Sequence, residues 1–170
     1  TDAFLEGDNT TDFIQHVVGI SGGLNHTMLL VRIEDSARLV EGSSVGIRTE
    51  VYAMGDNTRG QLGIWSVDNS AQNHVPRRVR GPVNEETKVP DPDKLGSTGE
   101  IAGQEVITRV IAGYNRSFAM TQDGQVYAWG DNTQSALNIV GTASAATVDG
   151  YVTLPTQMAD VDANNPVRAM

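Results

Sequence analysis

The sequence predicts an all-β protein built from small antiparallel sheets that repeat along the chain. The tetrapeptide GDNT occurs at 7–10, 55–58 and 130–133, and the last two copies stand in the matching segments VYAMGDNT (51–58) and VYAWGDNT (126–133). Apolar segments of strand length alternate with turn residues, and no stretch keeps a long helical period. Because repetition is the signature of a modular architecture, each copy is expected to form one unit of the same fold.

Each unit begins with a pair of predicted strands. The segments VVGIS (17–21) and ITRVI (107–111) align with each other, as do GLNHTMLLV (23–31) and GYNRSFAMT (113–121). Both alignments have an offset of 90 positions. A Gly-containing bend separates the two strands in each copy, which predicts an antiparallel pair.

The second and third strands are joined differently in the two copies. In the second copy TQDGQ (121–125) supplies an Asp-Gly pair between apolar runs, which is a strong hairpin signal. In the first copy the same junction is the charged, Gly/Ser-rich segment 32–50, because the third strands align at an offset of only 75. We expect this insertion to project from the hairpin tip.

The third strand of each copy runs into a GDN triplet. A glycine there suits a backbone conformation open mainly to glycine, and Asp and Asn side chains accept hydrogen bonds from nearby backbone N–H groups. The alternative is a ligand site that uses their oxygens. We interpret both triplets as structural turns, formed by Gly55, Asp56 and Asn57 and by Gly130, Asp131 and Asn132. A polar loop then leads to a short outer segment, VPRRV (75–79) or LPTQM (154–158).

The alignment divides the chain into four parts. Residues 1–13 resemble the end of a preceding unit, and residues 14–104 form the first repeat, with insertions at 32–50 and 64–105. Residues 105–165 form the second repeat, and residues 166–170 begin a third. Two units cannot close a ring, so the chain is a piece of a longer protein, or several copies assemble, or a partner covers the open faces.

The motifs of the first copy resemble the regulator of chromosome condensation repeat. They are Gly23 and His26, then VYAMGDN (51–57), then RGQLG (59–63), and the second copy supplies VYAWGDN (126–132). The resemblance implies β-propeller blades, usually seven small antiparallel sheets of four strands each. It therefore implies a partial propeller of about two blades, with long inter-strand and inter-blade loops.

Three positions depart from the family pattern. Met54 stands where Trp is usual, Arg116 stands where His is usual, and QSALN (134–138) replaces Gly-Gln-Leu-Gly. We expect these blades to be decayed or specialised.

Composition excludes several function classes. A net charge of −9 and a pI near 4.6 argue against nucleic-acid binding and favour a basic partner. The chain has no cysteine and no apolar run long enough to span a membrane. No phosphate-binding glycine loop or paired catalytic groups occur, and the segments 91–100 and 160–164 fall short of a calcium loop. The sequence thus predicts no cofactor, no metal site and no enzyme; a structural hydrogen bond is the expected role of His26.

The segment 64–105 offers candidate partner-binding residues, because loops on a rigid scaffold often carry binding. They are Trp65, Arg77, Arg78 and Arg80. The alternative is a solvated insertion. We predict a non-enzymatic protein-binding module or scaffold, part of a larger propeller. The alternatives are a structural subunit that self-assembles or joins a viral, phage or cell-surface shell, and a fragment of a small-GTPase exchange factor.

Overall fold

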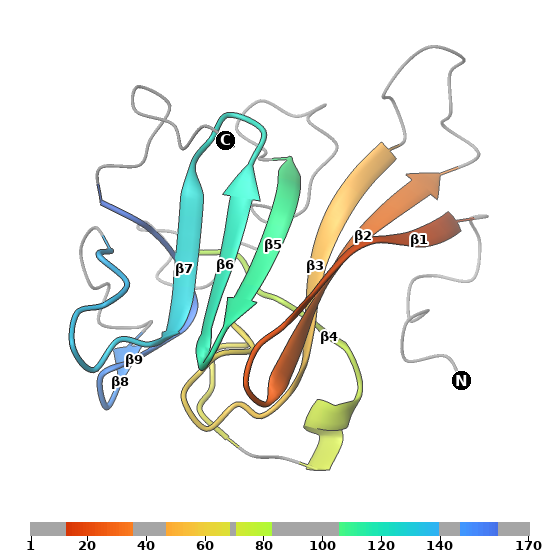
Figure 1. The fold of residues 1–170 in the computed structure, drawn as a ribbon. Coiled ribbons are helices and arrows are strands. Elements are labelled where there is room, and N and C mark those ends of the chain that lie inside the picture. Colours follow the sequence, from red (N-terminus) through yellow and green to blue (C-terminus); the bar gives the residue numbers. More distant parts are fainter. Residues whose placement is uncertain (1–12, 36–46, 69–70, 83–105, 140–146, 160–170) are drawn as a thin grey trace.

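The structure is a computed structural model that describes residues 13–35, 47–68, 71–82, 106–139 and 147–159. The predicted N-terminal unit end, the third-repeat start and the two segments tested as calcium loops fall outside these residues, apart from residue 13. Two antiparallel sheets lie side by side (Figure 1), and the one helical element among the described residues is a short 3₁₀ turn. The predicted fold class is confirmed: the chain is all-β and forms a partial propeller of two blades.

The first sheet, blade 1, has the strand order β1-β2-β3-β4. Its long strands β2 and β3 pair from His26 opposite Gly55 to Glu34 opposite Ile47. The strands therefore extend into both ends of the predicted insertion. The elements of this part of the chain are β1 (Phe13–Gly22), β2 (His26–Asp35), β3 (Ile47–Gly55), the 3₁₀ helix η1 (Ala71–His74) and β4 (Arg77–Arg78).

The second sheet, blade 2, has the order β5-β6-β7-β9-β8, one strand more than the repeat pattern implies. In its first strand, β5, the pairing register shifts between Ile107 and Arg109. The first strand of blade 1, β1, has a shift at the equivalent place, between Val17 and Gly19. The strands are β5 (Ile107–Gly113), β6 (Arg116–Thr121), β7 (Val126–Asp131), β8 (Thr147–Val148) and β9 (Tyr151–Gln157).

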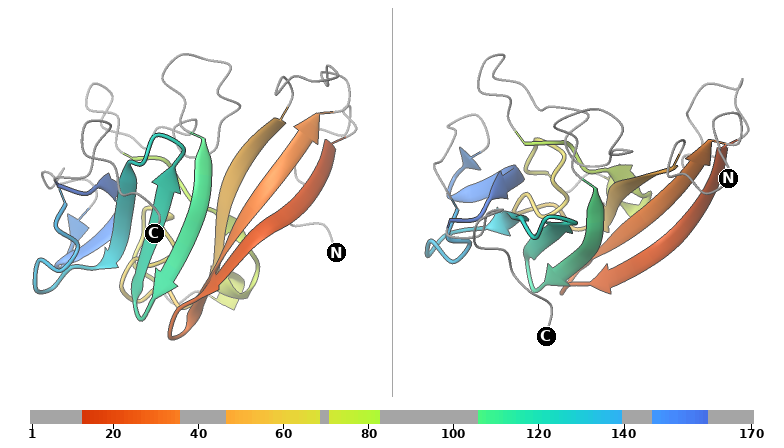
Figure 2. Two further views of the ribbon diagram at one scale, coloured as in Figure 1. Left: turned by 45° about the horizontal axis from the view of Figure 1, so that its top comes forward. Right: turned by 90° about the horizontal axis from the view of Figure 1, so that it is seen from above.

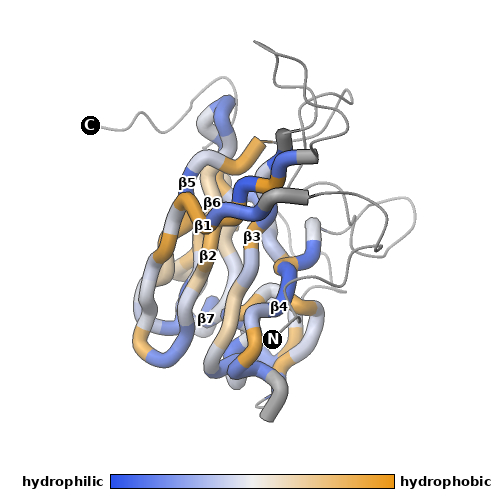
Figure 3. The backbone as a smooth tube through the Cα atoms, turned by 90° about the vertical axis from the view of Figure 1, so that its right-hand side faces the viewer, coloured by the Kyte–Doolittle hydropathy of each residue, from blue (hydrophilic) through white to orange (hydrophobic). Residues whose placement is uncertain are grey.

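The main hydrophobic core lies between the two blades. One face of β2 and β3 packs on the facing side of blade 2, as Figure 2 shows from two further directions. The backbone coloured by hydropathy carries apolar stretches along the strands (Figure 3), and in β2 the four consecutive apolar residues 28–31 put apolar side chains on both faces of the strand. The core includes Met28, Leu30, Val51 and Ala53 from blade 1 and Ile107, Val110, Ala119 and Trp129 from blade 2.

The turns and the loops that follow β3 and β7 gather at one end of the blades, at the bottom of Figure 1; we call it the loop end. The N–H of Asp56 donates to the carbonyl of Asn25 at 2.8 Å, which ties the first GDN triplet to the β1–β2 turn. The N–H of Leu24 donates to the carbonyl of Tyr114 at 2.9 Å, which ties this turn to its equivalent in blade 2. The hairpin between β6 and β7 lies at the opposite end.

Candidate functional site

The two GDN triplets have the same backbone geometry. Gly55 has a φ of 111° and Gly130 a φ of 102°, a region that L side chains rarely adopt. A Cβ on either glycine would overlap a backbone carbonyl, that of Asn25 or that of Asn115. Only glycine therefore fits at the end of the third strand in each blade.

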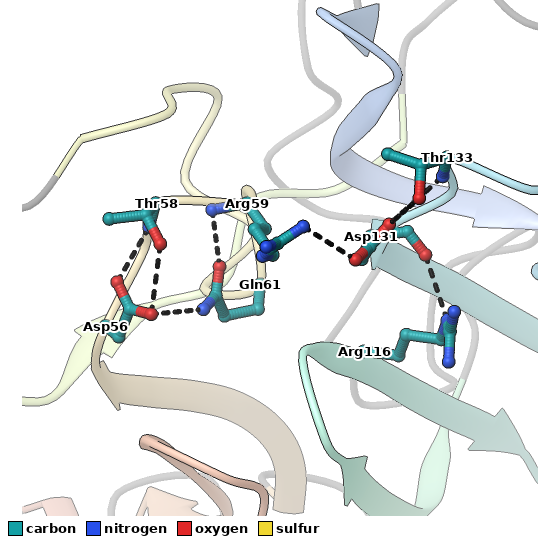
Figure 4. Close-up of polar contacts among 7 residues, drawn as sticks. All are labelled: Asp56, Thr58, Arg59, Gln61, Arg116, Asp131 and Thr133. Carbon is teal, nitrogen blue, oxygen red and sulfur yellow. Dashed lines mark hydrogen bonds and ion pairs between the residues drawn. The ribbon is translucent and has the colours of Figure 1, made fainter.

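Side chains of the triplet fix the turn from within. Asp56 accepts hydrogen bonds from the N–H of Thr58 at 2.9 Å and from its hydroxyl at 3.0 Å (Figure 4). Asn57 accepts from the N–H of Leu62 at 3.0 Å. The second copy repeats these bonds, since Thr133 donates to Asp131 and Leu137 donates to Asn132. Each of these side chains thus uses at least one oxygen within its own turn.

Within the described part of the chain, no three His, Asp or Glu side chains are grouped so as to hold a metal ion. No described helix has the length and hydropathy needed to cross a membrane.

The loop after the first GDN triplet packs against blade 2; we call residues 59–63 the first docking loop. A Cβ on Gly63 would lie 2.8 Å from Nε1 of Trp129, and a Cβ on Gly60 would lie 3.0 Å from the carbonyl oxygen of Val152. Beyond the loop, the N–H of Trp65 donates to the carbonyl of Thr153 at 3.1 Å. The glycines permit this close approach between blades.

A buried hydrogen-bond network lies at the centre of the seam between the blades. The hydroxyl of Ser117 and Nε1 of Trp129 both donate to the carbonyl of Gln61, at 2.7 and 3.0 Å. The hydroxyl proton is thereby committed, so Ser117 accepts at 2.9 Å from Nε2–H of His26. Segments far apart in the sequence thus meet in this network. His26 binds Ser117, and Ser117 and Trp129 both bind the carbonyl of Gln61.

The hydrogen bond between His26 and Ser117 runs in the opposite direction to that between a catalytic base and its nucleophile. A catalytic serine would donate its proton to an unprotonated histidine nitrogen, whereas here His26 donates to Ser117. Burial lowers the pKa of His26 below its ordinary 6.5, although the charge of Asp56 acts in the other direction. Its Nδ1 is buried and has no hydrogen-bond partner. The neutral imidazole is therefore the form that the seam accommodates.

An ion pair joins the two turns across the seam. Arg59 of the first docking loop lies 2.9 Å from the carboxylate of Asp131 (Figure 4). Its guanidinium also lies over the ring of Tyr151, 5.5 Å from the ring centre. Burial alone would raise the pKa of Asp131, but hydrogen bonds from Thr133 and the charges of Arg59 and Arg116 hold it below 3.8. The carboxylate is thus ionised where the two turns meet.

The candidate partner-binding residues take different partners. Trp65 is 40% exposed, and Arg80, also exposed, donates its backbone N–H to the carbonyl of Gly63. The half-buried Arg77 donates to Asn73 at 3.2 Å, and the exposed Arg78 lies 3.4 Å from Glu50. The side chains of Arg77 and Arg78 are thus engaged by separate parts of blade 1.

Glu50 forms a cluster that the sequence did not indicate. It is 5% exposed, pairs with Arg48 at 3.0 Å and accepts from the hydroxyl of Tyr52 at 2.9 Å. Burial, together with the charge and hydrogen bond of Glu50, raises the pKa of Tyr52 to about 12. Because every partner lies on the same blade, the cluster stabilises its outer strands.

Sequence reasoning also missed two exposed residues at the loop end. Leu24 is 53% exposed and Tyr114 is 64% exposed. Both follow the glycine of the first bend, in GLN (23–25) and GYN (113–115). The aligned repeats carried this signal, since each copy places a large side chain at a turn position that packing does not require.

Comparison with known families identifies these repeats. Residues 50–90 match the sequence model of the Regulator of chromosome condensation (RCC1) repeat, and residues 107–135 match a second model of the same repeat. Both repeats of the chain thus match this family over these residues. The resemblance inferred from the motifs of the two copies is thereby confirmed.

Curated relatives include the X-linked retinitis pigmentosa GTPase regulator of Canis lupus familiaris, 27% identical over 90 residues, and that of Mus musculus, 28% identical over 89 residues. These matches cover 53% and 52% of the chain and 7% of each relative, so the chain spans a small part of their length.

Similar solved structures include Prp20p from Saccharomyces cerevisiae, with a TM-score of 0.44, 16% identity and coverage of 92% of this chain and 41% of that one. Human WBSCR16 gives a TM-score of 0.43 and 16% identity, covering 85% and 39%.

The two positions at which the second regulator of chromosome condensation repeat departs from the pattern have clear structural consequences. Arg116, at the place of His26, donates its Nε–H to the carbonyl of Asp131 at 3.0 Å. Ser135 and Asn138, at the places of Gly60 and Gly63, keep positive φ values of 54° and 43°. The loop thus retains the backbone of the motif without its glycines.

Proposed function

We propose that this chain is a non-enzymatic protein-binding module, part of a larger propeller, that presents its loop end to a protein partner. The pair Leu24 and Tyr114 carries the proposal. Both side chains are exposed, and the backbone hydrogen bond of 2.9 Å between them fixes one blade turn beside the other. Exposed apolar and aromatic side chains on rigid turns are typical of protein interfaces.

The chemistry of the seam supports a role without catalysis. The buried histidine and serine hold the blades together, and the hydrogen bond between them runs in the wrong direction for a nucleophile. The net charge of −9 favours a partner with a basic surface. Because the curated relatives are named GTPase regulators, a GTPase is the first partner class to test.

A photo-crosslinking residue at position 114 tests the proposal. We expect an adduct with a discrete partner, whereas the same group at Gln122, exposed on the β6–β7 hairpin at the opposite end, should give none. The variant Leu24→Ala/Tyr114→Ala should bind the captured partner about tenfold or more weakly, with an unchanged melting temperature. Equal adducts from both positions, or full binding by the double variant, would contradict the proposal.

A further inference from the structure

Two aromatic residues have a left-handed backbone, a conformation that bulky side chains rarely adopt. Tyr114 has a φ of 53° and Trp65 has a φ of 65°. Among the described residues, the other non-glycine positions with positive φ are Ser135, Asn138 and Asp149, which have small or polar side chains. Since an aromatic residue strains the backbone at such a position, its presence needs a reason.

The backbone hydrogen bonds at these two positions do not supply that reason. The carbonyl of Tyr114 accepts from the N–H of Leu24 at 2.9 Å, and the N–H of Trp65 donates to the carbonyl of Thr153 at 3.1 Å. Both bonds cross the seam between the blades. Glycine would form the same bonds without strain, because it adopts the left-handed region freely. The seam therefore explains the conformation of the backbone but not the choice of an aromatic side chain.

The two aromatic side chains reach the surface. Tyr114 is 64% exposed and Trp65 is 40% exposed, whereas Trp129, the other tryptophan of the sequence, is 0% exposed. A side chain as exposed as that of Tyr114 removes little apolar area from water, so it contributes little to the stability of the fold. Backbone strain at an exposed aromatic residue therefore points to recognition rather than to packing.

Neighbouring blades of a longer propeller would leave this surface open. Leu24 occupies the position of Tyr114 in blade 1, where the following blade is present, and it is still 53% exposed. Tyr114 is exposed although the preceding blade is present. Trp65 lies between the two described blades, so both of its neighbours are already in place. The exposure of Tyr114 and Trp65 therefore belongs to the seam and not to the ends of the chain.

Tyr114 and Trp65 lie within reach of one partner. The turn that carries Tyr114 binds the end of β7, since the N–H of Asp131 donates to the carbonyl of Asn115 at 3.0 Å. β7 pairs with β9, and β9 accepts the N–H of Trp65. Neighbouring strands lie about 5 Å apart, so these three steps place Trp65 about 15 Å from Tyr114. Both anchors thus fit inside one standard interface, which buries about 800 Å² on each partner.

We propose that Tyr114 and Trp65 are the two anchors of a single interface that crosses the seam at the loop end and binds one folded protein with a basic surface. The inference rests on the proposed loop-end function and extends its surface to Trp65. Aromatic anchors on exposed turns need pockets in the partner, and pockets require a folded partner. Aromatic rings also attract Lys and Arg side chains, which agrees with the net charge of −9.

Photo-crosslinking from both positions tests the single interface. A crosslinking residue at position 65 should capture the same protein as one at position 114, and mass spectrometry of the two adducts should place the crosslinks in two separate regions of that protein. An adduct from position 114 without one from position 65 would overturn this inference and leave the loop-end function standing. Adducts with two different proteins would also overturn it.

Binding of the captured protein tests the two anchors separately. Trp65→Ala and Tyr114→Ala should each weaken binding about tenfold, and the double variant about a hundredfold, because distant anchors act independently. The control is Val18→Ala, which should bind normally, since Val18 is 54% exposed but lies six residues before Leu24 on β1. Unchanged binding by Trp65→Ala would overturn the proposal.

Tyr114→Gly tests whether the side chain is kept for the partner at a cost in stability. The variant should bind about tenfold more weakly and melt no lower than the wild type, because glycine is unstrained at a φ of 53°. Thermal melts followed by circular dichroism measure the second effect without any partner. A melting temperature lowered by several degrees would show that the ring of Tyr114 serves the fold and would overturn its role as an anchor.

Discussion

Residues 134–138, which we call the second docking loop, have the same backbone as the first docking loop, residues 59–63, and different surroundings. In both, Asp, Asn and Thr side chains form the turn, and the third and sixth positions after the GDN triplet have left-handed φ values. The first loop carries Gly60, Gln61 and Gly63 and is buried against blade 2, whereas the second carries Ser135, Ala136 and Asn138 and is exposed. The glycine, aspartate and asparagine of the GDN triplet therefore give the motif its shape. The residues of the loop that follows it decide whether the motif packs against a neighbouring blade.

The largest effect is expected from a change in the triplet that gives the motif its shape. Gly130→Val should lower the free energy of unfolding by about 3 kcal/mol or more, because valine is strained at a φ of 102° and its Cβ overlaps the carbonyl of Asn115. Urea denaturation monitored by fluorescence measures the change.

Gly150→Val is the matched control, since Gly150 has a φ of 83° but its Cβ would lie 3.7 Å from the nearest atom. The free energy of unfolding should fall by at least about 1 kcal/mol less in this variant than in Gly130→Val, because the valine adds backbone strain without a steric overlap. Equal losses would show that overlap with the β5–β6 turn contributes nothing.

A change in the loop residues that make the contact should have a smaller effect. Gly63→Ala is expected to cost about 2 to 3 kcal/mol, since the added Cβ meets Trp129 and Val79 at 2.8 and 2.9 Å. At the equivalent exposed position, Asn138→Ala should cost less than about 1 kcal/mol. Thermal melts followed by tryptophan emission compare the two, and similar losses would mean that burial does not distinguish the loops.

Acid should weaken the seam through His26. Because burial lowers its pKa below 6.5, the unfolded chain binds a proton in this window that the folded chain does not. Stability is therefore complete well above pH 6.5 and falls as the pH falls through and below that value, by about 1.4 kcal/mol per pH unit at most. Unfolding free energies measured across this range should show the slope in the wild type.

The control for this slope is His26→Asn, in which the titrating group is absent. The variant should be less stable at neutral pH and nearly independent of pH between about 5 and 7. Asp131 acts in a different window, because its pKa is lowered from 3.8 and its contribution is lost only at still lower pH. An unchanged slope in the variant would assign the acid sensitivity to other groups.

The fold could be predicted from the sequence because two aligned copies show which segments are equivalent strands and which are insertions. The offsets of 90 and 75 correctly placed the strand pairs and the third strands. The lengths of β2 and β3 were underestimated, since pairing continues to Glu34 and Ile47, into a segment that the alignment assigned to an insertion. Strand ends depend on long-range pairing, which local composition does not encode.

The seam was harder to predict than the blades. His26 and Ser117 are 91 positions apart, and a single sequence does not indicate that the two side chains form a hydrogen bond. Leu24 and Tyr114 are brought beside each other only because the two turns lie together at one end. The partner-binding prediction instead followed the long loop after the first turn to Trp65 and to the arginines at 77, 78 and 80, and it remains a prediction.

The smallest effect is expected from converting one docking loop toward the other at its charged position. Arg59→Gln copies Gln134 of the second loop and removes the ion pair with Asp131, but Arg59 is 39% exposed in its side chain, so solvent screens the pair. We expect a loss below about 1 kcal/mol, and less in high salt. Urea denaturation of this variant and of the wild type, at low and at high salt, measures the loss. A loss well above 1 kcal/mol for Arg59→Gln would mean that the ion pair, rather than the glycines and the buried network, holds the blades together.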